Sequence, residues 1–266
     1  MASERSLRVL IPLLCFILDV HTGSLNYQII GGHEAVPHSK PWMAYISYTN
    51  HGMTYICGGF LVRKDFVMTA AHCGGSNIKV SLGLHAVKEK NDKNTFSVLN
   101  IYRHPNYNSE THENDIMLLQ MNDEILLNEN IKVIALHKKN KKVPVGTECN
   151  VAGWGKTNRY LNVSSQVLME VNVTIVRNKE CQNILDMPID SSMICAGQSG
   201  TKGDAAQGDS GSPLVCEGVA TGIVSFGNEK PPGVYTLISS FLPWIRKIMS
   251  FSKPTMKDKT YRPLTS

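Results

Sequence analysis

One short segment of the sequence combines a nucleophile with a backbone suited to acyl transfer: Gly208-Asp209-Ser210-Gly211-Ser212-Pro213. A serine flanked by glycines on a tight turn exposes its hydroxyl while neighbouring backbone N–H groups converge on one point. That convergence is what a developing oxyanion needs. The alternative is an ordinary glycine–serine turn, because a serine is inert without a base. The segment indicates catalysis only if a base and its orienting group are found elsewhere.

Two further segments contain such partners. His72 lies in Thr69-Ala70-Ala71-His72-Cys73, and Asp115 lies in Asn114-Asp115-Ile116-Met117-Leu118-Leu119. Taken singly, each has an ordinary interpretation, since one of nine histidines is usually a surface residue and an aspartate before an apolar strand is usually a cap or turn residue. All three contexts together, in the order His, Asp, Ser, are improbable by chance. They predict a catalytic triad.

The elements that must position these residues are predicted to be short strands. Apolar, often β-branched stretches recur along the chain and are separated by clusters of Gly, Pro and Asn, which is typical of antiparallel sheet closed into barrels. A C-terminal helix is expected from Phe241 to Met249, with Ser239 and Ser240 as caps and Pro243 in its first turn. The expected strands lie at 42–47, 59–62, 66–70, 78–82, 116–121, 145–152, 168–176, 212–215, 219–226 and 233–237.

Both ends of the chain differ from this middle part. Arg5 and Arg8 precede an apolar run at 9–18, and small residues follow at 22–24, which predicts a secretory signal peptide over residues 1–24. A membrane anchor needs roughly twice that apolar length, and a buried helix would contain Pro12. We therefore expect a secreted protein without a membrane span. The tail, 252–266, is basic and is expected to be disordered.

Cysteine usage agrees with secretion. Of seven cysteines, Cys15 lies in the predicted signal peptide, so six remain and suggest three disulfides. The count alone permits 15 pairings, and no C-x-x-C spacing indicates zinc. Two sequons, at Asn162 and Asn172, are glycosylation candidates if they are exposed. Asn162 is the better candidate, because Asn172 lies in a strand-like run and must face solvent to be modified.

The charge balance narrows the choice of partners only slightly. Lys and Arg outnumber Asp and Glu by 27 to 22, a mild basic excess that favours polyanionic partners without requiring one. A nucleic-acid-binding protein would concentrate this charge beside stacking aromatic side chains, and the sequence has no such stripe. A solvated basic surface is the default interpretation.

The triad motifs and their order resemble the chymotrypsin family of serine proteases. The order differs from that of α/β-hydrolases, which run Ser, Asp, His, and from that of subtilisin-like enzymes, which run Asp, His, Ser. Ile29-Ile30-Gly31-Gly32 is similar to the family's mature N-terminus, and Gly153-Trp154-Gly155 to a central landmark. The resemblance implies an all-β fold of two antiparallel six-stranded β-barrels with the site between them. It divides the chain into a signal peptide at 1–24, an activation propeptide at 25–28, a peptidase domain at 29–251 and the tail.

The resemblance also implies a role for each matched residue. Ser210 is the nucleophile, His72 the general base and then acid, and Asp115 the group that orients His72. The N–H groups of Gly208 and Ser210 form the oxyanion hole, and a new Ile29 ammonium pairs with Asp209 to organise it. No metal or cofactor is implied. The implied disulfides are Cys57–Cys73, Cys149–Cys216 and Cys181–Cys195.

Substrate preference is expected to depend on Asp204, which the resemblance places on the floor of the primary specificity pocket. A desolvated carboxylate there favours Arg or Lys, whereas without the family frame Asp204 would be a turn residue beside Gly203. Gly227 and Gly233 leave the pocket walls open. The remaining pocket residues are Ala205 and Ser225. Because Ala205 offers no hydroxyl to the shorter Lys ammonium, we expect Arg to be preferred over Lys.

Within the family the motifs most resemble the granzymes of cytotoxic lymphocytes, particularly granzymes A and K. Four departures from relatives qualify this. Ala206 replaces a cysteine that braces the pocket rim in many relatives, and Leu84 replaces an acidic calcium ligand of trypsin. Asn106 replaces the cysteine through which granzyme A forms a dimer. Gln28 precedes Ile29 in place of Arg or Lys, which suggests that a dipeptidyl peptidase removes the pro-piece. We therefore expect a secreted or granule-stored monomer. Its partners would be protein substrates with Arg or Lys before the scissile bond, serpin inhibitors and acidic proteoglycan, and no nucleic acid. The alternative is a catalytically weak relative that acts as a polyanion-binding or antimicrobial protein.

Overall fold

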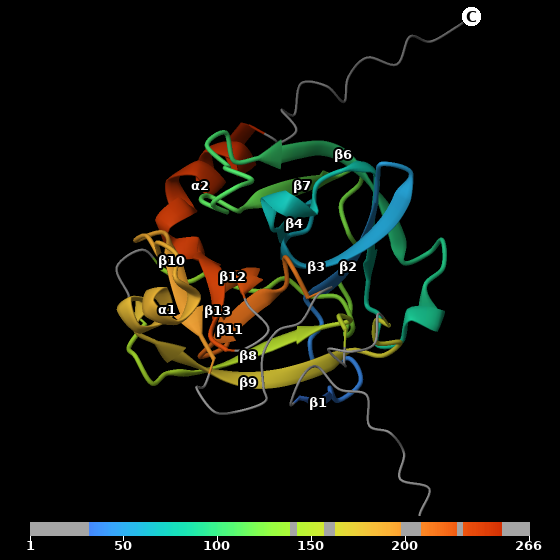
Figure 1. The fold of residues 1–266 in the computed structure, drawn as a ribbon. Coiled ribbons are helices and arrows are strands. Elements are labelled where there is room, and N and C mark those ends of the chain that lie inside the picture. Colours follow the sequence, from blue (N-terminus) through green and yellow to red (C-terminus); the bar gives the residue numbers. More distant parts are fainter. Residues whose placement is uncertain (1–31, 139–142, 157–162, 198–208, 228–230, 252–266) are drawn as a thin grey trace, which may run out of the picture.

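The computed structural model describes residues 32–138, 143–156, 163–197, 209–227 and 231–251. Within these residues the chain forms two antiparallel β-barrels, and their strands follow one another along the sequence (Figure 1). The prediction of an all-β protein with two six-stranded barrels and a C-terminal helix is therefore confirmed.

The first barrel closes in the order β2-β3-β4-β7-β6-β5. Its interior is apolar: every side chain of β4 is buried, and the alternate residues Ile46, Val80 and Leu118 are fully buried on other strands. Burial of this kind supplies most of the favourable free energy of folding. The strands are β2 (Met43–Asn50), β3 (Met53–Arg63), β4 (Phe66–Thr69), β5 (Ser76–Leu82), β6 (Thr95–Arg103) and β7 (Met117–Met121).

The second barrel follows the order β9-β10-β13-β12-β11-β8 and closes through pairing of β9 with β8. A seventh strand, β1 (His33–Glu34), pairs with the first residues of β9, Met169 and Glu170. Every second residue of β9 packs into the interior of this barrel, as the two-residue period of a strand requires: Met169, Val171, Val173 and Ile175. The strands are β8 (Glu148–Gly153), β9 (Met169–Val176), β10 (Met193–Ala196), β11 (Pro213–Cys216), β12 (Val219–Gly227) and β13 (Gly233–Leu237).

Two α-helices and three short 3₁₀ turns complete the described chain. The C-terminal helix α2 (Leu242–Phe251) has Pro243 in its first turn, as expected. Ser239 and Ser240 were expected to cap it, but they lie inside η3 (Ile238–Phe241), which runs directly into α2. The helix therefore starts from a preceding 3₁₀ turn, and the predicted cap is wrong. The remaining elements are η1 (Ala71–Cys73), η2 (Val87–Glu89) and α1 (Asn178–Leu185).

The last segment packs on the first barrel, although it follows the second in the sequence. Ile238, Phe241, Leu242 and Ile245 belong to the same buried cluster as the strands of the first barrel, and α2 lies beside β6 and β7 (Figure 1). The guanidinium of Arg63 also donates a hydrogen bond to the carbonyl of Met249 at 2.6 Å. The C-terminal segment therefore ties the two barrels together.

All three disulfide pairings implied by the family resemblance are present. Cys57 pairs with Cys73, Cys149 with Cys216, and Cys181 with Cys195. The first bond links β3 to η1 in the first barrel, the second links β8 to β11, and the third links α1 to β10.

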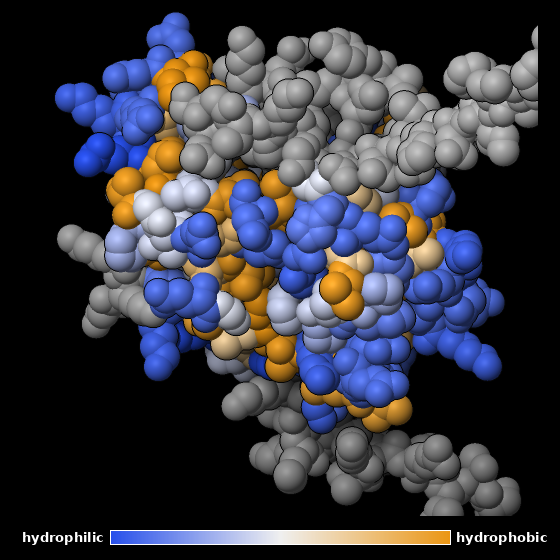
Figure 2. All heavy atoms as spheres, turned by 90° about the horizontal axis from the view of Figure 1, so that it is seen from below, coloured by the Kyte–Doolittle hydropathy of each residue, from blue (hydrophilic) through white to orange (hydrophobic). Residues whose placement is uncertain are grey.

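The side of the molecule seen in Figure 2 is mainly polar. Seen from below (Figure 2), hydrophilic side chains cover most of the described face, with a band of apolar side chains between them. Exposed large apolar residues include Val36 and Leu126, at 69% and 85% exposure. Neither of the helices in the described ranges has the length and apolar character needed to span a bilayer.

Candidate active site

His72 is positioned by the end of β4. The strand leads through Ala70 into the single 3₁₀ turn η1, which carries His72 between two buried residues, Ala71 and Cys73. The Cys57–Cys73 disulfide fixes this turn to β3. The hydroxyl of Thr69, the last residue of β4, donates a hydrogen bond to the carbonyl of Gly58 on β3 at 2.8 Å. A disulfide and a hydrogen bond therefore fix the turn that carries His72 to strand β3 of the first barrel.

Asp115 stands just before β7 and is fully buried. One carboxylate oxygen accepts the backbone N–H of His72 at 3.0 Å, and the other accepts the ring Nδ1–H of His72 at 2.7 Å. The Ser225 hydroxyl donates to the same second oxygen at 2.5 Å. Because Nδ1 carries the proton that Asp115 accepts, Nε2 of the neutral ring is left as a base.

The environment keeps Asp115 ionised. Burial alone raises the pKa of Asp115, but the hydrogen bonds and charge of His72, together with the hydrogen bond from Ser225, outweigh burial and hold the pKa below the ordinary aspartate value. The second barrel contributes another bond, because Thr236 on β13 donates its hydroxyl to the Asp115 carbonyl at 2.9 Å. Both barrels therefore hold this residue.

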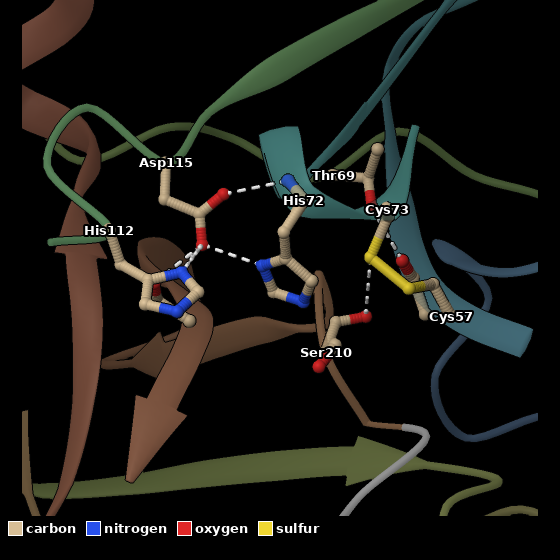
Figure 3. The surroundings of a disulfide bond; sticks show 9 residues. Cys57, Thr69, His72, Cys73, His112, Asp115 and Ser210 are labelled. Carbon is tan, nitrogen blue, oxygen red and sulfur yellow. Dashed lines mark hydrogen bonds and ion pairs between the residues drawn. A yellow bond between two sulfur atoms is a disulfide. The ribbon is translucent and has the colours of Figure 1, made fainter. Parts of the chain in front are cut away.

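Ser210 follows Asp209 at the start of a turn that leads into β11. Figure 3 shows it beside the imidazole of His72, on the side away from Asp115. Its carbonyl accepts the N–H of Gly58 at 2.8 Å, which fastens the turn to the first barrel. Gly211 has φ +83°, and a Cβ there would lie 2.5 Å from the Gly58 carbonyl oxygen. Only glycine fits this close approach of the two barrels.

No hydrogen bond joins the Ser210 hydroxyl to the His72 ring in this conformation, although both residues are described. Bonds between nucleophile and base are often loose in enzymes without bound substrate and tighten in the reacting complex. The structure brings together the three residues predicted from sequence, in the spatial order Asp115, His72, Ser210 (Figure 3).

Asp209 is also fully buried, and its surroundings explain the Gly153-Trp154-Gly155 landmark. The N–H of Gly155 donates to the Asp209 carboxylate at 2.9 Å. A Cβ at Gly153 would come within 2.1 Å of that carboxylate, and one at Gly155 within 2.7 Å. The two glycines therefore leave the space in which the aspartate sits, while Trp154 between them fills the neighbouring apolar cluster.

The residues predicted to line the specificity pocket are described in part. Gly227 on β12 pairs with Gly233 on β13, and a Cβ at Gly227 would lie 3.2 Å from the Gly233 Cα. The hydroxyl of Ser225 is directed at Asp115. Asp204, Ala205 and Gly208, which is predicted to contribute to the oxyanion hole, lie outside the described residues. So do Ile29 and the sequon residue Asn162.

Two other predictions from the sequence concern glycosylation at Asn172 and the lack of a calcium-binding loop at Leu84. The Asn172 side chain is exposed on β9, which meets the condition set for its modification, and it accepts a hydrogen bond from the Asn150 amide at 3.0 Å. Leu84, which we expected to rule out a calcium loop, is buried among apolar residues that include Met43 and Trp154. An apolar side chain in that setting offers no oxygen to a calcium ion.

Sequence reasoning missed one residue of the site, His112. Its ring stacks on Phe226 with centroids 5.2 Å apart, and it meets the His72 ring edge-on at 5.8 Å. Its Nδ1 is 3.9 Å from the Asp115 carboxylate. Burial lowers the pKa of His112 most strongly, Asp115 opposes this, and His72 adds to the lowering. In the sequence, His112 is marked only by its position three residues before Asp115. Histidines are common in loops, so this position did not indicate a role in the site.

Comparison with known proteins agrees with this geometry. The trypsin family model matches residues 29–245. Mast cell protease 3 of Ovis aries is 46% identical over 84% of this chain and 89% of its own length, and human cathepsin G is 42% identical over 96% and 99%. Granzyme B of Rattus norvegicus is 43% identical over 92% of this chain and all of its own length.

Solved structures agree as well. The structure titled "Structure of GrC" is 40% identical and superposes with a TM-score of 0.79, covering 84% of this chain and 100% of that one. Mouse neuropsin, described as a serine protease expressed in the limbic system of the brain, is 35% identical with a TM-score of 0.74, over 82% and 98%.

Fold, site and relatives together define a chymotrypsin-like serine endopeptidase. The chain belongs to the trypsin family, and its relatives include granzymes, cathepsin G and a mast cell protease. The more particular likeness to granzymes A and K stays a prediction.

Proposed function

We propose that this protein is a secreted or granule-stored endopeptidase that cleaves after Arg or Lys, using His72, Asp115 and Ser210. The observation that carries the triad assignment is the pair of hydrogen bonds from His72 to the buried Asp115, with Ser210 on the opposite side of the ring. This arrangement fixes the imidazole tautomer that a general base needs.

In the proposed reaction the Ser210 oxygen attacks the scissile carbonyl while Nε2 of His72 takes the serine proton. The negative charge that develops on the carbonyl oxygen is stabilised by the N–H groups of Gly208 and Ser210. His72 then gives the proton to the leaving amine. In the second half of the reaction water attacks the acyl-enzyme, His72 takes a proton from the water, and Ser210 leaves with a proton from His72. Asp115 stays ionised throughout and stabilises the imidazolium.

Activation is proposed to require removal of the predicted signal peptide, 1–24, and propeptide, 25–28, so that the domain 29–251 begins with a free Ile29 ammonium. The support is the buried carboxylate of Asp209, next in the chain to Ser210 and enclosed by Gly153 and Gly155. A pairing of this ammonium with Asp209 would stabilise the turn that supplies the oxyanion hole.

Specificity for Arg or Lys rests on Asp204 as the floor of the pocket. The support is that Gly227 and Gly233, which pair across β12 and β13, carry no side chain to narrow the predicted pocket. Because Ala205 provides no hydroxyl, Arg should be cleaved faster than Lys, since Arg reaches the carboxylate with two hydrogen bonds.

The test uses the mature chain beginning at Ile29 and peptide esters that differ only in the residue before the scissile bond. We expect kcat/KM to rank Arg above Lys, with apolar residues far below both. Asp204→Ser should abolish tryptic cleavage and still allow a fluorophosphonate to label Ser210, while Ala205→Ser should raise the rate on Lys selectively. Near-native cleavage after Arg by Asp204→Ser would refute the pocket assignment.

A second candidate function, polyanion binding by a catalytically weak protein, is favoured by the net charge of +5. Storage on acidic proteoglycan would use the same surface, and serpins would be the natural inhibitors of an active enzyme. Fluorophosphonate labelling together with retention on a heparin column separates the two candidates. Retention without labelling would favour the binding protein. A mobility shift on glycosidase treatment, lost in Asn162→Gln or Asn172→Gln, would identify the glycosylated sequon.

A further inference from the structure

The carboxylate of Asp115 faces a second histidine besides His72. Figure 3 shows Asp115 between the rings of His112 and His72, with contacts to both. His112 comes from the loop between β6 and β7 and adopts φ +54°, while Asn114 adopts φ +57°. The Asn114 amide donates to the Asn106 carbonyl at 2.9 Å and fixes this turn. The loop therefore aims His112 at the aspartate.

The contact of His112 with Asp115 is not a hydrogen bond. The 3.9 Å from Nδ1 to the carboxylate oxygen exceeds hydrogen-bond range, and the buried Nδ1 atom has no other hydrogen-bond partner. A buried imidazole nitrogen without a partner is rare and needs an explanation. Packing holds the ring in place all the same, between Phe226 on one side and His72 on the other.

Three potential metal ligands therefore converge. One nitrogen of His72, one of His112 and a carboxylate oxygen of Asp115 lie within 4.8 Å of one another. Two histidines and a carboxylate, with a fourth position left to water, form a common set of protein ligands for zinc. Ligand atoms on a tetrahedral zinc ion lie about 3.3 Å apart, given Zn–N bonds of about 2.0 Å. The observed 2.7 Å and 3.9 Å separations from Asp115 lie on either side of that value.

We propose that His72, His112 and Asp115 form a reversible inhibitory site for Zn²⁺. The inference rests on the proposed triad, because the ion binds two of its members. As the ion binds Nδ1 of His72, the proton leaves Nδ1 and Nε2 takes up a proton from solvent, so the ring stays neutral. The hydrogen bond from His72 to Asp115 breaks, a Zn–Nδ1 bond forms, and Nε2 no longer has a free lone pair. An imidazole bound to a dication accepts a further proton poorly, so His72 no longer serves as the base for Ser210.

The surroundings suit such a site. The Asp115 carboxylate is oriented by the backbone N–H of His72 and the hydroxyl of Ser225, as ligands in metal sites commonly are. The side chains of His72 and His112 are 22% and 31% exposed, so an ion reaches them from solvent. Imidazole nitrogens favour zinc and copper over magnesium and calcium. The other close group in the described chain, Cys57, His72 and Cys73, has both sulfurs in a disulfide.

The test begins with the mature chain, freed of metal by a chelator and titrated with ZnCl₂ during turnover of a small ester. We expect inhibition that excess chelator reverses, stronger inhibition by Cu²⁺, and none by Mg²⁺ or Ca²⁺ at the same concentrations. Calorimetry on the Ser210→Ala protein should show one zinc ion per chain. Since that protein performs no catalysis, the measurement stands even if the proposed protease function fails.

Variants assign the ligands. His112→Gln removes the imidazole, and His112→Phe keeps a ring against Phe226, so at least one folded variant is expected. Each is compared with its own metal-free rate, and the zinc inhibition constant should rise at least roughly tenfold, with a matching loss of calorimetric affinity. His33→Gln, an exposed histidine on β1, serves as the control and should leave both values unchanged. Zinc affinity unchanged by both His112 substitutions, or no zinc binding to the Ser210→Ala protein, would overturn the proposal.

Discussion

The site contains two fully buried aspartates, Asp115 and Asp209, whose carboxylates are surrounded by different groups. Asp115 is held by hydrogen bonds from His72 and Ser225, so side chains of both barrels orient it. Asp209 is enclosed by the backbone of Gly153 and Gly155. The half of the site around Asp115 is therefore complete once the chain has folded. For the half around Asp209, we propose that the Ile29 ammonium, which proteolysis creates, supplies the positive charge.

Asp115→Asn should produce the largest effect. The amide retains the shape of the residue but no longer accepts two N–H groups as a charged acceptor, so the wrong tautomer of His72 is favoured. We expect kcat on a small ester to fall about 10⁴-fold, the loss known for this substitution in chymotrypsin-type triads. Circular dichroism serves as the control for folding. A loss below tenfold would mean that Asp115 does not orient the base.

An extension at the N-terminus should have the next largest effect and should act on the other aspartate. A chain that keeps Tyr27-Gln28 cannot present a free Ile29 ammonium to Asp209, and breaking one side of such a buried pair costs about 3–5 kcal/mol. We expect turnover of an Arg ester at least about a hundredfold slower than for a chain beginning at Ile29. Equal rates for the two equally folded proteins would refute both the activation mechanism and the role of Asp209.

Gly155→Ala tests the enclosure of Asp209 directly. The added methyl group would lie 2.7 Å from the carboxylate, and such overpacking typically costs about 1–3 kcal/mol of stability. We expect a lower free energy of unfolding in urea and a matching loss of activity. In an Asp209→Ala background the same substitution should cost clearly less, because the group it displaces is gone. Equal costs in both backgrounds would place the clash elsewhere.

The smallest effect concerns acid stability. Because the pKa of Asp115 is lower in the folded chain than in the unfolded chain, its contribution to stability is fully present above the unfolded value and is lost as pH falls through the folded value. His72 and His112 face this carboxylate. The difference in melting temperature between the wild type and Asp115→Asn should therefore shrink as pH falls below about 4. A constant difference down to pH 2 would contradict the lowered pKa.

The sequence predicted the barrels and the triad because short β-branched strands and the three motif contexts are local signals. It missed β6, where a shift of register between Val98 and Asn100 interrupts the alternation of apolar residues. It missed α1 because only Cys181 and Leu185 are buried in it, too few for a helical pattern. His112 was not predictable, since its role depends on packing against Phe226, which is far away in the sequence.

The contact of α2 with the first barrel has a consequence for how the protein is made. A ribosome releases the strands of the first barrel long before Phe241, Leu242 and Ile245, which complete that barrel's core. His72 and Asp115 are thus synthesised early, whereas the residues of η3 and α2 that pack against their barrel are synthesised last. The core of the first barrel is therefore complete only after this last segment has been synthesised. A stop codon shortly before residue 242 would therefore damage the first barrel, although the strands of that barrel are encoded far upstream of it.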